Sequence, residues 1–245
     1  MAEGMTLQML TAQELRNTGT TWTNNEQFEK DGYVVEKDLW DPEELYYPCP
    51  NERGQMSYWD SNPQHFKHVP VEHQVEGSLA RYWHPQYRKI HSGVRKKLEK
   101  EIGRKLYNTY YYDRYYFPGQ ALTKHADRDA CEISVSIHIS TNLPDDEKDW
   151  PFMIKTPDTY TDKKKTNILV PGEERSAVLN PGDGLLYKGC ERPHWREAMP
   201  GTPTGKKSKK LFGKKQQQDQ YYHLIFFHYV LQDGQRAHCA WDRAR

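Results

Sequence analysis

The most regular pattern in the chain runs from Ile133 to Ser140, where apolar and polar residues alternate without interruption. Ile133, Val135, Ile137 and Ile139 fall on one side, and Ser134, Ser136, His138 and Ser140 fall on the other. Because successive side chains of a strand point to opposite faces of a sheet, this alternation predicts a strand with one face in an apolar core.

Shorter apolar and aromatic segments surround this strand and are separated by turns that contain Gly or Pro. They cover residues 106–117, 152–154, 168–170, 177–179, 184–187, 194–197 and 221–230. Many short strands with such turns are typical of an all-β sandwich or barrel. The 17 Tyr, 7 Trp and 7 Phe of the chain fit this class, since aromatic residues favour strands.

The segment from Pro85 to Gly103 has a helical period instead. Its apolar residues recur every four positions, at Ile90, Val94, Leu98 and Ile102, while Arg and Lys fill the other sides. This spacing predicts an amphipathic helix, and Gly103 is suited to end it in the left-handed conformation.

Weaker patterns precede this helix. Residues 32–36 form a short apolar segment that predicts a strand, Asp41 followed by Pro42 predicts the start of a helix, and residues 5–15 are compatible with another. We therefore expect residues 1–105 to form a strand-and-helix support region within one domain. Residues 106–245 would form its β core.

Composition excludes several classes of protein. The formal net charge of the 245 residues is +1, so no overall field favours nucleic acid or a membrane surface. No apolar run approaches the roughly 18 residues of a membrane helix, and the N-terminus lacks the basic and apolar regions of a signal peptide. The four Cys show no CxxC spacing, which favours reduced thiols. These features predict a cytoplasmic protein.

Two polar segments interrupt the β core. Residues 156–167 read as a polar, mobile loop. Residues 200–219 contain six Lys and end in Gln-Gln-Gln-Asp, which is typical of a solvated, partly disordered insertion. The alternative is a basic lid that attracts an acidic substrate or a phosphate.

Candidate chemistry lies at His125 and Asp127, and again at His194, which follows 69 residues (194 − 125) after the first His. Positions i and i+2 of an extended segment face the same way, so His125 and Asp127 could hold one ion. Two His and one carboxylate form the facial triad of non-haem Fe(II) oxygenases, which leaves three coordination positions open. An isolated His-x-Asp is a weak signal, so the metal-site interpretation depends on the motifs that surround it.

Those surroundings form an ordered set of motifs. A Tyr-rich strand with a Gly turn precedes His-x-Asp-Arg, followed by Cys-Glu-x-Ser, Pro-Gly-Asp, His-Trp-Arg-Glu and an aromatic strand with His-Tyr. These occupy residues 110–119, 125–128, 131–134, 181–183, 194–197 and 227–229. From about Leu106 to Val230 the chain resembles the 2-oxoglutarate- and Fe(II)-dependent oxygenases of the prolyl-4-hydroxylase-like branch. More closely, it is similar to a set of mostly uncharacterised bacterial and phage members.

The resemblance implies a double-stranded β-helix with N-terminal helices packed against it, and Fe(II) held by His125, Asp127 and His194. It also implies 2-oxoglutarate and O2 as co-reactants, with ascorbate as an optional addition. The product would be a hydroxylated C–H bond of a peptide, proline included, or of a small molecule, together with succinate and CO2. A phage-encoded member would work in the host cytoplasm. The alternatives are an inactive binding module on this fold and an iron dioxygenase that does not use 2-oxoglutarate.

The anchor for the distal carboxylate of 2-oxoglutarate departs from the family pattern. Many members place an Arg or Lys shortly after the distal His, where this chain has Pro203 and Thr204, while Lys206 and Lys207 lie in the basic segment. Arg196 shares a strand face with His194 and offers a bidentate fork, so it is the preferred anchor. The alternative is an outer salt bridge from Arg196 to Glu197 or Glu132.

Expected roles can also be given for His138, Tyr115 and Asp183. His138 could be a core histidine or a contact to the same carboxylate. Tyr115 lies on the strand before the His-x-Asp, where related enzymes often place a Tyr against 2-oxoglutarate, although packing alone would also explain it. Asp183 follows Pro-Gly and is expected to make turn hydrogen bonds, without a chemical role.

Overall fold

The computed structural model describes residues 25–47, 74–163, 166–202 and 220–242. The predicted helix at residues 5–15 and almost all of the basic segment lie outside these ranges. No helix in the described part of the chain is long and apolar enough to cross a membrane.

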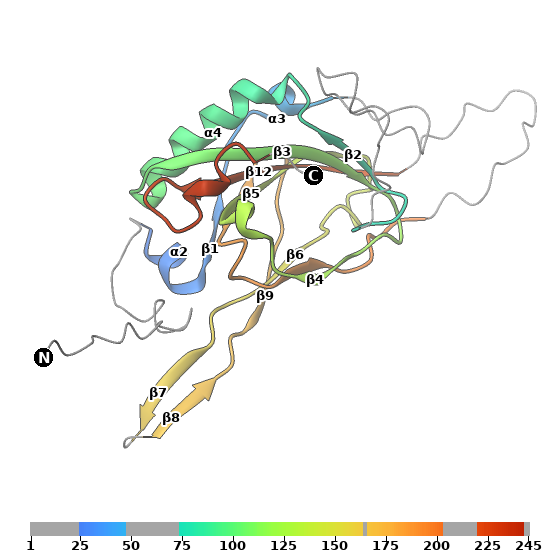
Figure 1. Cartoon of the computed structure of the whole chain (residues 1–245). Coiled ribbons are helices and arrows are strands. Elements are labelled where there is room, and N and C mark those ends of the chain that lie inside the picture. The colour runs from blue at the N-terminus through green and yellow to red at the C-terminus, as the bar shows by residue number, and fades with distance from the viewer. Residues whose placement is uncertain (1–24, 48–73, 164–165, 203–219, 243–245) are drawn as a thin grey trace, which may run out of the picture.

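Two antiparallel sheets face each other across an aromatic core (Figure 1). The larger sheet has the order β1 (Tyr33–Glu36), β10 (Gly184–Tyr187), β5 (Ile133–Thr141), β12 (Tyr222–Leu231), β3 (Leu106–Tyr116) and β2 (Leu79–Tyr82). The smaller sheet has the order β4 (Leu122–His125), β11 (His194–Arg196), β6 (Phe152–Lys155) and β9 (Glu174–Ala177). A separate hairpin is formed by β7 (Thr159–Lys163) and β8 (Thr166–Val170).

The chain crosses repeatedly between the two sheets. β3, β5, β10 and β12 belong to the larger sheet, whereas β4, the pair β6 and β9, and β11 belong to the smaller one. This alternation in chain order is the topology of a double-stranded β-helix. The predicted mainly-β class and this fold are therefore confirmed.

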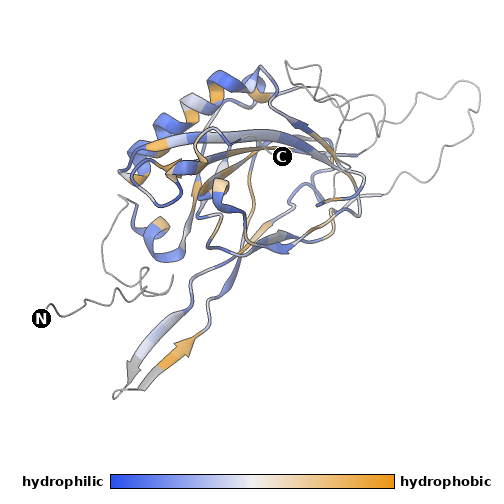
Figure 2. Ribbon diagram, in the orientation of Figure 1, coloured by the Kyte–Doolittle hydropathy of each residue, from blue (hydrophilic) through white to orange (hydrophobic). Residues whose placement is uncertain are grey.

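Helix α4 (Tyr87–Ile102) covers the outer face of the larger sheet (Figure 1). Its buried side chains include Ile90, Val94 and Leu98, which join one cluster with the apolar side of β5. Gly103 follows the helix with a φ of 68°, as expected for a left-handed C-cap. Figure 2 shows the hydrophilic outer side of the same helix.

Two short helices support the start of the fold. α2 (Glu26–Asp31) begins where Asn25 accepts a hydrogen bond from the Phe28 backbone, and α3 (Pro42–Leu45) begins at Asp41 with Pro42 in its first turn. These contacts satisfy backbone N–H groups that a helix start leaves unpaired.

The space between the sheets is filled mainly by aromatic side chains. Tyr110, Tyr112 and Tyr116 of β3 pack there with Tyr222, Leu224 and Phe226 of β12 and with Leu122 of β4. Large rings from facing strands close the barrel interior to bulk water, so polar groups that remain inside need a partner or a function.

The structure differs from the sequence expectation at residues 156–167, whereas the strand expected at residues 168–170 is present as part of β8. Most of the expected polar loop belongs to the β7–β8 hairpin, which projects away from the two sheets (Figure 1). Strand β2 was likewise not expected. β2 and β7 are held by backbone pairing and show no apolar alternation, so the hydrophobic pattern of the sequence did not reveal them.

Candidate metal centre

Strand pairing explains how two distant histidines meet. β4 and β11 are antiparallel neighbours in the smaller sheet, and their register places His125 directly opposite His194. Asp127 follows the end of β4, and its backbone N–H donates to the Gly189 carbonyl at 2.9 Å. The structure thus brings together all three residues of the expected triad.

The donor atoms converge on one carboxylate oxygen. Oδ1 of Asp127 lies 3.5 Å from Nε2 of His125 and 3.6 Å from Nε2 of His194. One donor atom from each residue lies within 4.8 Å of the other two. The three groups therefore surround a space in which one ion could contact all of them.

The other ring nitrogens fix the orientation of both imidazoles. Nδ1 of His125 lies 2.8 Å from the Thr123 carbonyl, and Nδ1 of His194 lies 2.9 Å from the Arg192 carbonyl. Because a carbonyl only accepts, each Nδ1 carries the hydrogen, and each Nε2 directs its lone pair toward the centre. This is the form in which histidine binds metals.

The electrostatics suit a cation. Burial opposes ionisation of Asp127, but the surrounding imidazoles of His125, His194 and His228 lower its pKa to about 2. Burial lowers the pKa of His194 below its ordinary value. At neutral pH the centre therefore holds a carboxylate and a neutral His194, which fits the two-His, one-carboxylate site of Fe(II).

A second group of residues holds the other oxygen of Asp127. The Ser134 hydroxyl donates to Oδ2 at 3.2 Å and lies 2.9 Å from Nδ1 of His228. His228 is buried, and burial lowers its pKa to about 4, so its ring is neutral. Cys131, Asp127 and His228 also have donor atoms within 4.8 Å of one another.

These supporting residues were missed as site residues from the sequence. Ser134 lies on the polar side of the alternating strand, and His228 lies in the aromatic final strand. Their position beside Asp127 depends on the pairing of β5 with β12, which sets His228 opposite Ser134. A polar side chain on the inner face of a predicted core strand was the available signal.

Arg196 is buried inside the barrel with part of its guanidinium unsatisfied. Its side chain is almost fully buried, with a relative exposure of 2% for the residue, and Nη1 donates to the Trp150 carbonyl at 2.7 Å. Nε and Nη2 have no hydrogen-bond partner among the described residues. The group lies over the rings of Trp150, Phe152 and Tyr222, at 4.6, 5.3 and 5.5 Å from their centroids.

The alternative salt bridges of Arg196 are not formed. Glu197 accepts from the indole of Trp195, and Glu132 accepts from the Leu231 backbone and from Arg236. Burial lowers the pKa of Arg196. A buried cation with two nitrogens that the described residues leave unsatisfied is costly, and an anion bound at that position would remove the cost.

His138 shares this region with Arg196. Its Nδ1 lies 2.7 Å from the Leu179 carbonyl, its ring stacks on Tyr222 at 4.0 Å, and its Nε2 has no partner among the described residues. Burial lowers the pKa of His138 to about 4. The ring is thus neutral and held in place like that of a core histidine, while its Nε2 stays available for a contact to a carboxylate.

Tyr115 is not brought to the site, and its expected contact to 2-oxoglutarate is a correction. Its hydroxyl donates to the Tyr47 carbonyl, and its ring stacks on His223 at 3.8 Å, on the outer side of the larger sheet. The inner side of β3 is occupied instead by Tyr112 and Tyr116. Side chains alternate along a strand, so the assignment was one position out of phase.

The other residues considered from the sequence are Asp183 and two lysines of the basic segment. Asp183 accepts hydrogen bonds from the backbones of Asn180 and Asp38, in keeping with its expected turn role. Lys206 and Lys207 lie outside the described residues.

Gln74 lies against the candidate centre. Its amide nitrogen is 3.0 Å from Nε2 of His125, and its carbonyl accepts from Nη2 of Arg114 at 3.1 Å. Nε2 is the atom that His125 would present to a metal. Gln74 therefore marks a direction from which a ligand or substrate would meet the ion.

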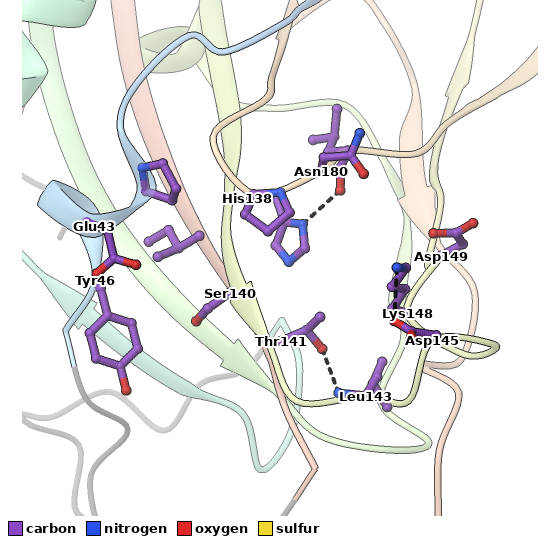
Figure 3. Close-up of a pocket in the computed structure, with 14 residues that line it drawn as sticks. Glu43, Tyr46, His138, Ser140, Thr141, Leu143, Asp145, Lys148, Asp149 and Asn180 are labelled. Carbon is purple, nitrogen blue, oxygen red and sulfur yellow. Dashed lines mark hydrogen bonds and ion pairs between the residues drawn. The ribbon is translucent and has the colours of Figure 1, made fainter.

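A pocket of about 390 Å³ opens at the end of β5 beside His138 (Figure 3). Its lining includes Glu43, Tyr46, Ser140, Lys148 and Asn180. None of the three triad residues lines it. It approaches the barrel from the side of His138 rather than from the metal centre.

Comparison with known proteins gives structural neighbours only. No family model matches the chain, and no curated protein matches it. A prolyl-4-hydroxylase from Pseudomonas putida is 11% identical, with a TM-score of 0.47 over 82% of this chain and 95% of the other. A prolyl hydroxylase from Trichoplax adhaerens, in complex with a hypoxia inducible factor peptide, is 13% identical, with a TM-score of 0.46 over 83% and 86%.

A third structure is HygX from Streptomyces hygroscopicus with nickel and 2-oxoglutarate bound. It is 10% identical, with a TM-score of 0.45 over 82% of this chain and 84% of the other.

Proposed function

We propose that the protein is an Fe(II)- and 2-oxoglutarate-dependent oxygenase that hydroxylates a C–H bond. The observation that supports this best is the convergence of Nε2 of His125 and Nε2 of His194 on Oδ1 of Asp127, with both Nδ1 atoms held by backbone carbonyls. Imidazole and carboxylate donors in this ratio leave open positions for a co-substrate and O2.

In this proposal His125, Asp127 and His194 hold Fe(II). When bound, the ion with 2-oxoglutarate and O2 supplies the oxidising power, and succinate and CO2 are released. The chain supplies geometry: Ser134 and His228 orient Asp127, while the aromatic residues between the sheets keep bulk water from the centre.

Arg196 is the proposed anchor for the distal carboxylate of 2-oxoglutarate. It lies two residues beyond His194 on the same face of β11, and positions i and i+2 of a strand are separated by roughly 6–7 Å. Its free Nε and Nη2 could form a charge-assisted pair with a carboxylate. His138 and the pocket beside it adjoin the same region through Tyr222.

The substrate belongs to the proposal in broad terms only. Peptides, with proline among the target residues, and small molecules are the classes to be tested, and ascorbate stays an optional addition. The prolyl-4-hydroxylase-like branch is likewise a proposal, supported by the ordered motifs of the sequence.

The direct test is to measure succinate formation from 2-oxoglutarate with Fe(II) and O2, beside product masses increased by one oxygen atom. We expect succinate with the wild-type chain, and loss of both metal binding and succinate in Asp127→Ala with the fold retained. O2 consumption without 2-oxoglutarate would indicate the alternative iron dioxygenase. Failure to bind Fe(II) or turn over would indicate the binding module.

A further inference from the structure

The β7–β8 hairpin stands apart from the rest of the fold (Figure 1). Its two strands pair only with each other in the described part of the chain, with Thr159 opposite Val170 and Thr161 opposite Ile168. A single two-stranded hairpin is marginally stable in water, because it has little surface to bury. Pairing with a further strand would therefore stabilise this hairpin.

The hairpin also exposes most of the large apolar side chains that the described surface leaves in solvent. Ile168 is 51% exposed, Leu169 49%, Tyr160 46% and Val170 41%. Figure 2 shows the hydrophobic colour on the later part of β8, next to its arrowhead. Exposed apolar residues that gather on one element mark an interaction site rather than ordinary surface.

The two strands differ in how their outer edges are protected. β7 has the sequence Thr-Tyr-Thr-Asp-Lys and includes two charges. β8 has the sequence Thr-Asn-Ile-Leu-Val, without a charge or a proline. Natural proteins block edge strands with charge or proline, so the open edge of β8 is the one suited to further pairing.

We propose that β8 pairs antiparallel with β8 of a second copy of this chain, about a twofold axis at Ile168. The two hairpins would then form one continuous four-stranded sheet. Centring the register on Ile168 sets Leu169 opposite position 167 and Val170 opposite position 166, and none of these positions carries a charged residue, so no like charges are opposed.

A second copy fits this edge better than a charged peptide strand does, because the edge offers no charge to attract one. The pairing is isologous, so a single contact uses the same surface of both copies and leaves neither β8 edge open. Two hairpins alone bury less than a standard interface of about 1,600 Å². We therefore expect a concentration-dependent equilibrium between monomer and dimer.

The first test is sedimentation velocity of the full chain over a range of concentrations. Wild type should shift toward a dimer as concentration rises, whereas Ile168→Lys should stay monomeric because it opposes two like charges on the axis. Val178→Lys is the matched control, since Val178 is an aliphatic residue 41% exposed outside the hairpin, and it should dimerise as wild type does.

The second test locates the axis by cross-linking. Directly opposed residues of antiparallel strands have Cα atoms about 4.5–5.5 Å apart, which is within the range of a disulfide. Under mild oxidation Ile168→Cys should give a covalent dimer on a non-reducing gel, and Val178→Cys should not. A wild type that stays monomeric at all concentrations, a dimer that survives Ile168→Lys, or equal cross-linking of both Cys variants would overturn the proposal.

Discussion

The hydroxyl of Ser134 donates to Oδ2 of Asp127 at 3.2 Å, while Oδ1 of the same carboxylate makes the contacts to His125 and His194. Oδ2 thus fixes the orientation of the carboxylate, and Oδ1 faces the candidate metal position. Ser134 in turn lies 2.9 Å from Nδ1 of the neutral His228, so the orientation is set from two strands of the larger sheet.

Ser134→Ala should therefore weaken metal binding while leaving the fold intact. Removing a hydrogen bond that orients a metal ligand usually costs about 10- to 100-fold in affinity, and we expect a loss in this range for Fe(II) or Co(II). Isothermal titration and the absorption spectrum of bound Co(II) would measure it.

Ser136→Ala provides the matched control for that variant. Ser136 lies on the same strand and is equally buried, but its hydroxyl has no hydrogen-bond partner among the described residues. Its loss should leave metal affinity within about threefold of wild type, well below one factor of ten or 1.4 kcal/mol. Equal losses in both variants would show a packing effect and remove Ser134 from the site.

Gly189→Ala should disturb the centre by crowding. A Cβ at this position would lie 2.6 Å from Oδ2 of Asp127 and 2.3 Å from the Cys131 carbonyl. Overpacking of this kind usually costs about 1–3 kcal/mol, and here it would also displace a ligand. We expect a lower unfolding temperature together with reduced Co(II) affinity.

Gly119→Ala separates strain from crowding in the same experiment. A Cβ there meets nothing within 4 Å, but the φ of 84° disfavours any residue with a side chain. It should lower stability by about 1–2 kcal/mol and leave metal affinity unchanged. Unaltered metal binding in Gly189→Ala would mean that the turn at 189 yields without moving Asp127.

The elements that rest on local pattern could be predicted from the sequence. The alternation at Ile133–Ser140 corresponds to β5, and the four-residue period before Gly103 corresponds to α4. Both signals arise within one element, where burial of one face imposes the period. The facing of His125 and His194 is different, because it depends on the pairing of two strands separated by 69 residues (194 − 125).

The errors also have physical causes. Six of the eight residues from Tyr110 to Phe117 are aromatic and they occupy both faces of the strand, so the segment contains no polar–apolar alternation that would identify the inward face. Residues 159–163 of the β7–β8 hairpin were expected to belong to a loop because this segment is polar. Contacts such as Ser134 with His228 require the register of β5 and β12, which no local pattern encodes.

Stability should fall in mild acid because His91 is buried without charge. Burial lowers its pKa to about 3, and its Nε2–H donates to the His228 carbonyl at 3.1 Å. The unfolded chain has a histidine pKa of about 6.5, so between these values it binds more protons than the folded chain. The free energy of unfolding should therefore decrease as pH falls from about 6.5, by up to 1.4 kcal/mol per pH unit for this group.

His91→Gln tests the source of that slope. Gln retains an N–H donor for the His228 carbonyl but cannot take up the proton, so urea unfolding between pH 6.5 and 4 should show a shallower decrease. His238→Gln is the control, since that ring is exposed on η3 (Ala237–Cys239). An identical pH profile for His91→Gln and wild type would show that other groups cause the acid sensitivity.

Arg196→Met should separate co-substrate binding from metal binding. If Arg196 anchors the distal carboxylate, its loss should raise the KM for 2-oxoglutarate by about 30-fold to several thousand-fold, which corresponds to roughly 2–5 kcal/mol. Metal affinity without co-substrate should change far less, because Arg196 is not a proposed ligand. Lys at this position should restore binding only in part, since it keeps the charge and loses the fork.

The stability of the same variant distinguishes an anchor from a structural arginine. Two guanidinium nitrogens lack partners in the part of the chain that the structure describes, and burial disfavours the charge, so Arg196→Met should unfold at no lower denaturant concentration than wild type in the absence of 2-oxoglutarate. Added 2-oxoglutarate should then stabilise wild type and fail to stabilise the variant. His138→Leu is the control for the rival contact, because the His138 ring stacks on Tyr222. If His138→Leu raises the KM steeply while Arg196→Met leaves it within about threefold, the carboxylate binds at His138 and Arg196 serves the packing of Trp150 and Tyr222.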